Sequence, residues 1–236
     1  MSKRDLDEQL GAMADMSVPA PSAALLEMVR MGGASATRKP WRDLGVIVGV
    51  AGALAVLYTW RAGVRSDLAA LPSIWFYATL AAWTFAFVTP LAVALMPRRG
   101  SVLADSGRAA LLALAVPTLV TAMSIWLRVD APGATVIPAA EQQLHYIRSC
   151  LTTGLMMAAI PLVASFIALR RAALPSDTRW LGAAIGAANG SLAGGILHAH
   201  CSMGGVLHVT MGHASAATVG AIVGAIVVPA VVRRGR

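Results

Sequence analysis

The sequence has little charge for its length. Only 13% of its 236 residues are Asp, Glu, Lys or Arg, whereas 57% are hydrophobic and the mean hydropathy is +0.69. A soluble globular domain carries about 25% charged residues, so a bilayer is the natural solvent for much of this chain. The net charge of +8 does not indicate nucleic-acid binding, because the basic residues are scattered between apolar runs instead of forming one continuous face.

Ionisable residues and cysteines are scarce where membrane enzymes and transporters use them. No Asp, Glu, Lys or Arg occupies the centre of a long apolar run, whereas a transporter or channel would place ionisable groups inside its spans. The two cysteines, Cys150 and Cys201, are far apart in sequence. A disulfide-generating membrane enzyme would carry a C-x-x-C pair. We therefore expect neither a transporter nor an enzyme.

Six apolar stretches are long enough to cross a membrane as helices, which takes about 20 residues. They cover residues 44–60, 74–96, 109–127, 149–169, 180–198 and 211–232. We therefore predict an all-α, polytopic membrane protein with a six-helix transmembrane domain over residues 44–232. The preceding arm, residues 1–43, is polar and mixed in charge, so we expect the first apolar run to be retained as a helix and not cleaved as a signal peptide.

The basic residues are distributed unequally between the segments that connect these runs. Fifteen of the 19 Lys and Arg residues fall in the N-terminal arm, in alternate loops and at the C-terminus. Basic loops remain on the cytoplasmic side, so this distribution predicts that both termini are cytoplasmic. With that topology, both cysteines and all five histidines lie at the outer face of the membrane.

Small residues recur every four positions along the last two apolar runs. They are Gly182, Gly186, Gly190 and Gly194 in the fifth run, and Gly212, Ala216, Gly220 and Gly224 in the sixth. This spacing is typical of helix pairs whose backbones approach closely. We therefore expect the two stripes to face each other across a short antiparallel connection.

The connection between these runs, ILHAHCSMGGVLHVTMGHA, contains four of the five histidines and one cysteine. Extending each stripe by four residues brings His198 and His208 together, with Cys201 near the same face. The same helical phase directs His200 and His213 elsewhere.

A cysteine–histidine cluster at this position has three interpretations. With Cys150 or His145 as a further ligand, it would bind Zn²⁺ or another transition metal. Alternatively, Cys150 and Cys201 form a disulfide or a thiol pair that responds to oxidants. The third interpretation is that the histidines form hydrogen bonds at the membrane interface and the cysteine is inert.

Apolar residues recur at helical spacing in two short segments of the N-terminal arm. They include Leu6, Leu10 and Met13 in the first segment, and Leu25, Leu26 and Val29 in the second. Two short helices cannot bury a core alone, so their apolar faces need a partner. Acidic residues in the first segment favour a protein with a basic surface over an anionic bilayer.

From Cys150 onward the chain resembles the NrsF-type (negative regulator of sigma F) family of integral-membrane anti-sigma factors. The matching features are CLTTGLMMAAIPLVASFIALRRAALP, a glycine-stepped span that ends in His200-Cys201, and a histidine, His213, before a second glycine-stepped span. RSDLAALPSIWF, after the first span, is also similar to the family. Ser202 stands where we would expect a proline.

This resemblance implies a multi-pass protein of the bacterial inner membrane that is a negative regulator of transcription. Its cytoplasmic arm would hold an extracytoplasmic-function (ECF) sigma factor inactive until an envelope signal, metal or oxidative stress, arrives. Cys150 and Cys201 would be the outer-face sensor, with His200 and His213 beside Cys201. The partners would be the sigma factor and the bilayer, with no direct contact to nucleic acid. The alternative is a membrane oxidoreductase or a haem- or metal-binding protein that uses the same cluster.

Overall fold

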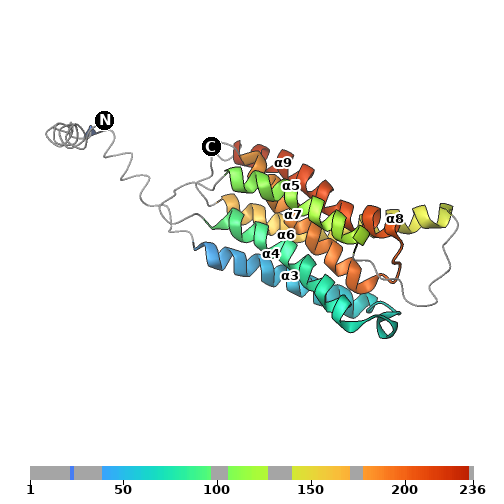
Figure 1. The fold of residues 1–236 in the computed structure, drawn as a ribbon. Helices are drawn as coiled ribbons and strands as arrows, with labels where there is room; N and C mark the ends of the chain where they lie inside the picture. Colours follow the sequence, from blue (N-terminus) through green and yellow to red (C-terminus); the bar gives the residue numbers. More distant parts are fainter. Residues whose placement is uncertain (1–21, 24–38, 97–105, 127–139, 171–177, 234–236) are drawn as a thin grey trace, which may run out of the picture. The chain divides into compact units, whose positions relative to one another are not determined.

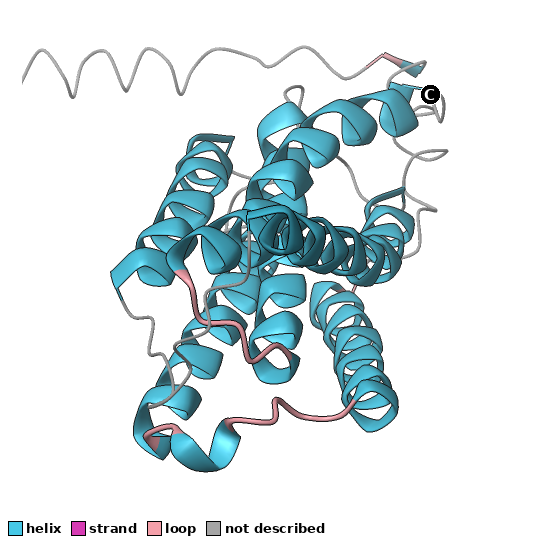
Figure 2. Ribbon diagram, turned by 90° about the vertical axis from the view of Figure 1, so that its right-hand side faces the viewer, coloured by secondary structure: helices cyan, strands magenta, loops and turns pink. Residues whose placement is uncertain are grey.

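The computed structural model of the chain describes residues 22–23, 39–96, 106–126, 140–170 and 178–233. These residues form helices and connecting loops, and they contain no strand (Figure 2). The apolar arm residues expected to bind a partner lie outside the described residues. They are Leu6, Leu10, Met13, Leu25, Leu26 and Val29.

Six helical segments are long and apolar enough to cross a membrane, which confirms the all-α, six-span prediction. The long helices are α3 (Pro40–Ala62), α4 (Ser73–Leu95), α5 (Ser106–Trp126), α6 (Ala140–Arg170), α7 (Thr178–His200) and α9 (Ser215–Arg233). The short elements are η1 (Leu68–Ala70), α8 (Val206–His208) and the π-helix η2 (Val209–Ala214), and the last two continue into α9. The long helices run side by side, and α3 begins at the end of the bundle where α9 finishes (Figure 1).

The helix α6 starts at Ala140, well before the apolar run that begins at residue 149. Its first turns are polar, and Glu141 lies in the first turn, where a negative charge stabilises a helix N-terminus. Hydropathy detects only the apolar part of a helix, so this polar extension was not expected from the length of the run.

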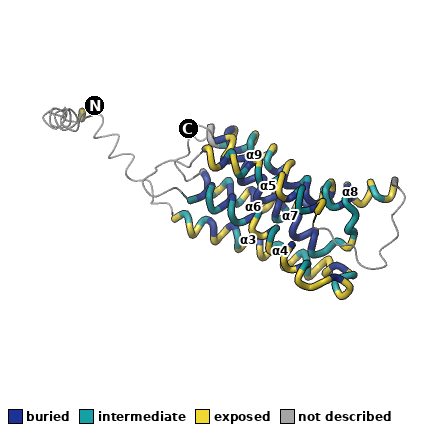
Figure 3. The backbone as a smooth tube through the Cα atoms, in the orientation of Figure 1, coloured by how far each residue is buried: buried dark blue, intermediate teal, exposed yellow. Residues whose placement is uncertain are grey.

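The helix α7 lies at the centre of the bundle. Inside the molecule, 89% of its most apolar window is buried, against 17% to 39% for the other five spans; the buried colour follows α7 in Figure 3. The outer faces carry large exposed apolar side chains, among them Trp60, Ile74 and Trp126, which are 79%, 81% and 83% exposed. Extensive exposed apolar surface of this kind suits contact with lipid.

Small residues allow the backbones of α7 and α9 to contact each other. Gly182, Gly186 and Gly190 face Gly224, Gly220 and Ala216. A Cβ atom added to any of the three α7 glycines would lie nearer than 3.0 Å to the α9 backbone, so side chains larger than hydrogen do not fit there. The stripe-to-stripe contact does not extend to the loop end, where Gly194 faces Trp83 of α4 and Gly212 faces Cys150 of α6. The π-helix that contains Gly212 changes the helical phase before α9 begins.

Candidate functional site

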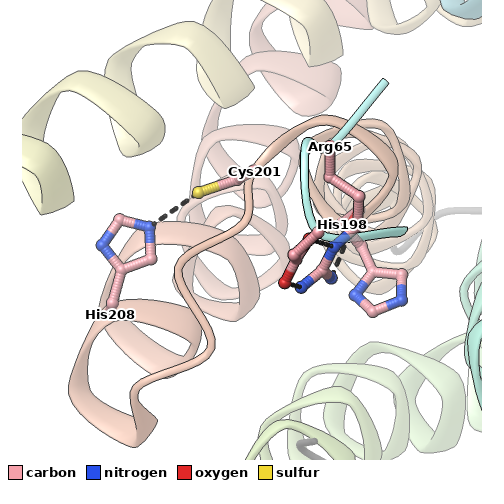
Figure 4. A network of polar contacts seen from close by, with 5 residues as sticks. Arg65, His198, Cys201 and His208 are labelled. Carbon is pink, nitrogen blue, oxygen red and sulfur yellow. Dashed lines mark hydrogen bonds and ion pairs between the residues drawn. The ribbon is translucent and has the colours of Figure 1, made fainter. Parts of the chain in front are cut away.

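Two cysteines and two histidines converge at the end of the bundle where α7 finishes. Cys150 lies on α6, Cys201 directly follows α7, and His208 and His213 belong to the segment that leads into α9. One sulfur or ring nitrogen from each residue lies within 4.8 Å of the other three. The Cys201 Sγ atom is 3.3 Å from His208 Nε2 (Figure 4) and 4.0 Å from Cys150 Sγ. We call these four residues the Cys/His cluster.

A π-helix places the two histidines of the Cys/His cluster on the same side of their segment. A π-helix joins residues five apart through its backbone hydrogen bonds, and His208 and His213 are separated by five positions along η2. Their rings are 5.2 Å apart and nearly perpendicular. A regular α-helix would rotate the second ring away from the first. Single π-helical turns occur frequently at functional sites.

The histidines of the Cys/His cluster are buried without enough hydrogen-bond partners. His208 and His213 are 0% and 1% exposed. Within the described part of the chain, both ring nitrogens of His213 and the Nδ1 atom of His208 have no hydrogen-bond partner. An unsatisfied buried polar group costs about 1–3 kcal/mol. A bound ion or water beside them would remove this cost, and a cavity of about 20 Å³ lined by Cys201 and His213 offers space for one.

The two sulfurs are accessible from outside the bundle. Both cysteines are free thiols and half-buried, and they line a cavity of about 460 Å³. Its polar lining residues come from α3 and the loop after it, from α6, and from the end of α7 and the loop after it: Tyr58, Ser66, Tyr146, Ser149, Thr153, His200 and Ser202. A metal ion or a small oxidant can therefore approach the thiols through this cavity, while the two histidines remain behind them.

The environment of Cys201 favours its thiolate. The hydrogen bond from the Cys150 thiol, followed by that from His208, lowers the pKa of Cys201, although burial opposes the shift. The thiolate is the form of cysteine that binds metals and reacts with oxidants. Cys201 is therefore the more reactive of the two cysteines, both toward metal ions and toward oxidants.

The donor set fits a tetrahedral, thiophilic metal ion. With Zn–S bonds of about 2.3 Å and Zn–N bonds of about 2.0–2.1 Å, tetrahedral ligands lie roughly 3.3–3.8 Å from one another. The four donor atoms are already within 4.8 Å, so a contraction of roughly 1 Å would complete such a site. Two thiolates and two imidazoles fill all four positions, as in metal sites that do not carry out catalysis.

The remaining two histidines of the connection lie elsewhere. His198 packs against the rings of Trp75 and Phe76, at 5.3 and 5.6 Å. His200 places its Nδ1 atom 2.8 Å from the Gly63 carbonyl oxygen, and its ring contacts Tyr58. The glycine phase predicted His198 beside His208, but the structure places His213 there. The phase fails for His198 because Gly194, four residues earlier on α7, already faces Trp83 of α4, and it fails for His213 because η2 is a π-helix and not an α-helix.

The structure also brings a buried arginine to this end of the bundle that the sequence analysis did not identify. Arg65, in the loop after α3, is 5% exposed and forms an ion pair with Asp67. Its guanidinium group reaches the carbonyl oxygen of His198 (Figure 4). The sequence gives no signal for this role, since a loop arginine beside a span is ordinary in a membrane protein.

Comparison with known families gives one match. Residues 29–233, most of the chain, match the family model described as "Negative regulator of sigma F". The chain matches no curated protein and no solved structure.

Proposed function

The chain belongs to the negative regulator of sigma F family, and from this premise we propose that it is a membrane anti-sigma factor of the ECF type. The family description implies negative regulation of a sigma factor, so the partner class is a sigma factor. In this proposal the N-terminal arm binds the sigma factor on the cytoplasmic side of a bacterial inner membrane. The apolar positions of the arm, with acidic residues between them, suit a basic protein surface.

We further propose that the Cys/His cluster receives the signal that releases the sigma factor. The observation that carries this proposal is the convergence of four potential ligands from three segments, two of them buried and short of hydrogen-bond partners. The cluster lies at the end of the bundle opposite the start of α3, where the arm is attached. The distribution of basic residues supports an outer-face position for that end.

Two envelope stresses suit this donor set. Zn²⁺ or a softer thiophilic ion would bind to the two sulfurs and two ring nitrogens, since thiolate and imidazole ligands favour such metals. An oxidant would join Cys150 to Cys201 in a disulfide, with loss of one hydrogen from each thiol to the oxidant. Both events draw Cys201 toward its neighbours, so both stresses have the same mechanical consequence.

The sigma-factor assignment is tested on the full-length protein purified from its membrane in lipid nanodiscs. Mass spectrometry of the purified complex should identify a sigma factor in stoichiometric amount. The double substitution Leu6→Asp and Leu10→Asp should remove it, because it places charge on the apolar face of the first arm segment. Ser17→Ala, a polar position on the same arm, is the matched control and should retain it. The sigma-factor assignment would be contradicted if the wild type carried no sigma factor, or if the double variant retained it as Ser17→Ala does.

A visible absorption spectrum of the same preparation tests the alternative of a redox enzyme. An anti-sigma factor with this cluster should show no haem or flavin band. Such a band in stoichiometric amount, without a bound sigma factor, would replace the proposed function by an oxidoreductase.

A further inference from the structure

We propose that α3 transmits the state of the Cys/His cluster to the N-terminal arm, and that a polar clasp beside Cys201 controls its position. This inference rests on the proposed function, because it identifies how a signal at one end of the bundle reaches the sigma-binding arm. The polar clasp consists of Gly63, Arg65 and Asp67, which follow α3, together with residues 198–200 at the end of α7.

Three polar contacts join the two sides of the polar clasp. The backbone N–H of Arg65 donates to the carbonyl oxygen of Ala199 at 3.0 Å. The Arg65 Nη1 atom lies 3.5 Å from the carbonyl oxygen of His198. On the other side, the ring Nδ1 of His200 donates to the carbonyl oxygen of Gly63 at 2.8 Å. The first two contacts satisfy carbonyl groups at the C-terminus of α7, which have no partner within the helix, and the third satisfies the Gly63 carbonyl after α3.

Arg65 is held in place by a second set of bonds. Its Nε and Nη2 atoms donate to the two carboxylate oxygens of Asp67 at 2.6 and 2.7 Å. A bidentate arrangement of this kind fixes the plane of the guanidinium group, and the side chain is 5% exposed. The polar clasp is therefore a preformed structure and not a chance surface contact.

The buried residues of α3 lie along the half that begins at the arm, whereas in the other half the Tyr58 ring contacts His200 of the polar clasp. The buried residues are Leu44, Ile47 and Ala51, and beyond Ala51 no residue of this fully described helix is buried. Leu44, Ile47 and Ala51 belong to a core cluster with side chains of α4, α6, α7 and α9. This half provides a pivot, since its side chains interlock with the rest of the bundle.

Two cavities lie beside α3, and most of their α3 lining residues belong to its other half. One, of about 630 Å³, lies between α3, α4 and α7 and is lined by apolar residues such as Ala55, Val56 and Phe87. The other is the cavity of about 460 Å³ through which the sulfurs are reached. This half of α3 has room to move, and the polar clasp is what ties it to the end of α7.

The polar clasp and the Cys/His cluster meet in adjacent residues. Ala199 and His200 immediately precede Cys201, so a displacement of Cys201 is passed directly to both. Completing a metal site requires a contraction of roughly 1 Å, and a disulfide requires the sulfurs to approach from 4.0 Å to about 2.05 Å. A shift of this size takes hydrogen bonds of 2.8 and 3.0 Å beyond bonding distance. The signal opens the polar clasp, α3 turns about its packed half, and the arm releases the sigma factor.

The first test measures whether the polar clasp holds α3, without any sigma factor or signal. Hydrogen exchange is followed in the full-length protein in nanodiscs. In His200→Ala, amides of residues 56–63 should exchange at least roughly two- to tenfold faster than in wild type, because the hydrogen bond to Gly63 and the ring contact with Tyr58 are both lost. Amides of residues 44–51 should be unchanged. His145→Ala, an exposed histidine at the same end of the bundle, is the control and should match wild type. Equal exchange of residues 56–63 in all three proteins would overturn the proposal.

The second test measures whether movement of α3 is needed for release. Ala55→Phe fills the cavity beside α3, so it should retain the sigma factor when Zn²⁺ is added to the purified complex. Ala53→Phe, two residues away on an exposed face of α3, should release the sigma factor as the wild type does. Release from Ala55→Phe at the wild-type level would contradict a role for α3.

Failure of this inference and failure of the proposed function give different results. If the chain does not bind a sigma factor, the wild-type complex is never isolated, yet the exchange measurement still reports on the polar clasp. If the complex forms and responds to Zn²⁺ while His200→Ala and Ala55→Phe behave as wild type, the proposed function stands and the transmission through α3 is wrong.

Discussion

The helices α7 and α3 are both membrane spans of 23 residues, yet they are packed in opposite ways. In α7, 89% of the apolar window is buried, and its glycines touch the α9 backbone. In α3 the corresponding value is 17%, and Cβ atoms added at Gly45, Gly49 or Gly52 would meet no described atom within 4 Å. The comparison distinguishes a rigid centre, α7, which ends at the Cys/His cluster, from α3, which is packed only lightly beyond its first half. A sensor needs both properties, since local stability differs between the parts of a protein that hold shape and the parts that move.

The largest effect should come from enlarging a glycine of the rigid centre. Gly186→Leu places a side chain where a Cβ atom alone would collide with the Gly220 backbone. Overpacking typically costs about 1–3 kcal/mol and more where backbones are in contact, so we expect the protein to fail to accumulate in the membrane. Gly49→Leu on α3 is the matched control and should accumulate normally. Quantitative immunoblotting of membranes measures the level of each variant. Equal levels would contradict the claim that α7 is packed more tightly than α3.

Metal affinity should distinguish two buried histidines, His213 of the Cys/His cluster and His198 outside it. His213→Ala removes a ligand, so Co²⁺ affinity, read from the thiolate-to-metal absorption of the purified protein, should fall at least about 100-fold. His198→Ala removes a ring that packs against Trp75 and Phe76, and affinity should stay near that of wild type. A greater loss from His198→Ala than from His213→Ala would show that the ligand set has been assigned wrongly.

Mild oxidation should form one specific disulfide at the end of the rigid centre. Diamide takes up the two hydrogens of the Cys150 and Cys201 thiols as their sulfurs, now 4.0 Å apart, become bonded. Intact mass spectrometry should show a loss of two hydrogens in wild type and no internal disulfide in Cys201→Ser. The oxidised protein should no longer bind Co²⁺. Undiminished Co²⁺ binding after oxidation would show that the two cysteines are not ligands of the metal site.

The smallest effect should come from the turn that follows α3. Gly63 has φ = +84° and presents its carbonyl oxygen to His200. Side chains disfavour this conformation by about 1–3 kcal/mol, so Gly63→Ala should weaken the polar clasp without touching the Cys/His cluster. We expect unchanged Co²⁺ affinity and a roughly two- to tenfold rise in basal transcription, because a larger share of the sigma factor is released. Basal transcription at the wild-type level would show that this turn does not contribute to repression.

The six spans could be predicted from the sequence because the length of an apolar run is a local property. The approach of α7 and α9 could also be anticipated, since small residues at intervals of four mark a surface that accepts another backbone. The polar start of α6 could not, because hydropathy does not distinguish a polar helical turn from a polar loop.

The composition of the Cys/His cluster could be predicted only in part. The sequence identified Cys201 as the central residue and named both histidines among its candidates. The glycine phase favoured His198 and His208, whereas the family resemblance favoured His200 and His213, so each selected one histidine of the cluster, because helical phase takes no account of the π-helix η2. The polar clasp could not be predicted either, because His200 and Gly63 are 137 positions apart in the sequence and no spacing rule relates residues at that distance.

Release of the sigma factor from its purified complex with the full-length protein in nanodiscs tests most directly whether the Cys/His cluster controls the sigma factor. Zn²⁺ is added, and the sigma factor that remains bound is quantified for the wild type and for the Cys150→Ser, Cys201→Ser double variant. We predict that the wild type loses its sigma factor as Zn²⁺ binds, whereas the double variant retains it at the same Zn²⁺ concentration. Equal retention by both proteins, or equal release from both, would contradict the claim that the Cys/His cluster controls the sigma factor.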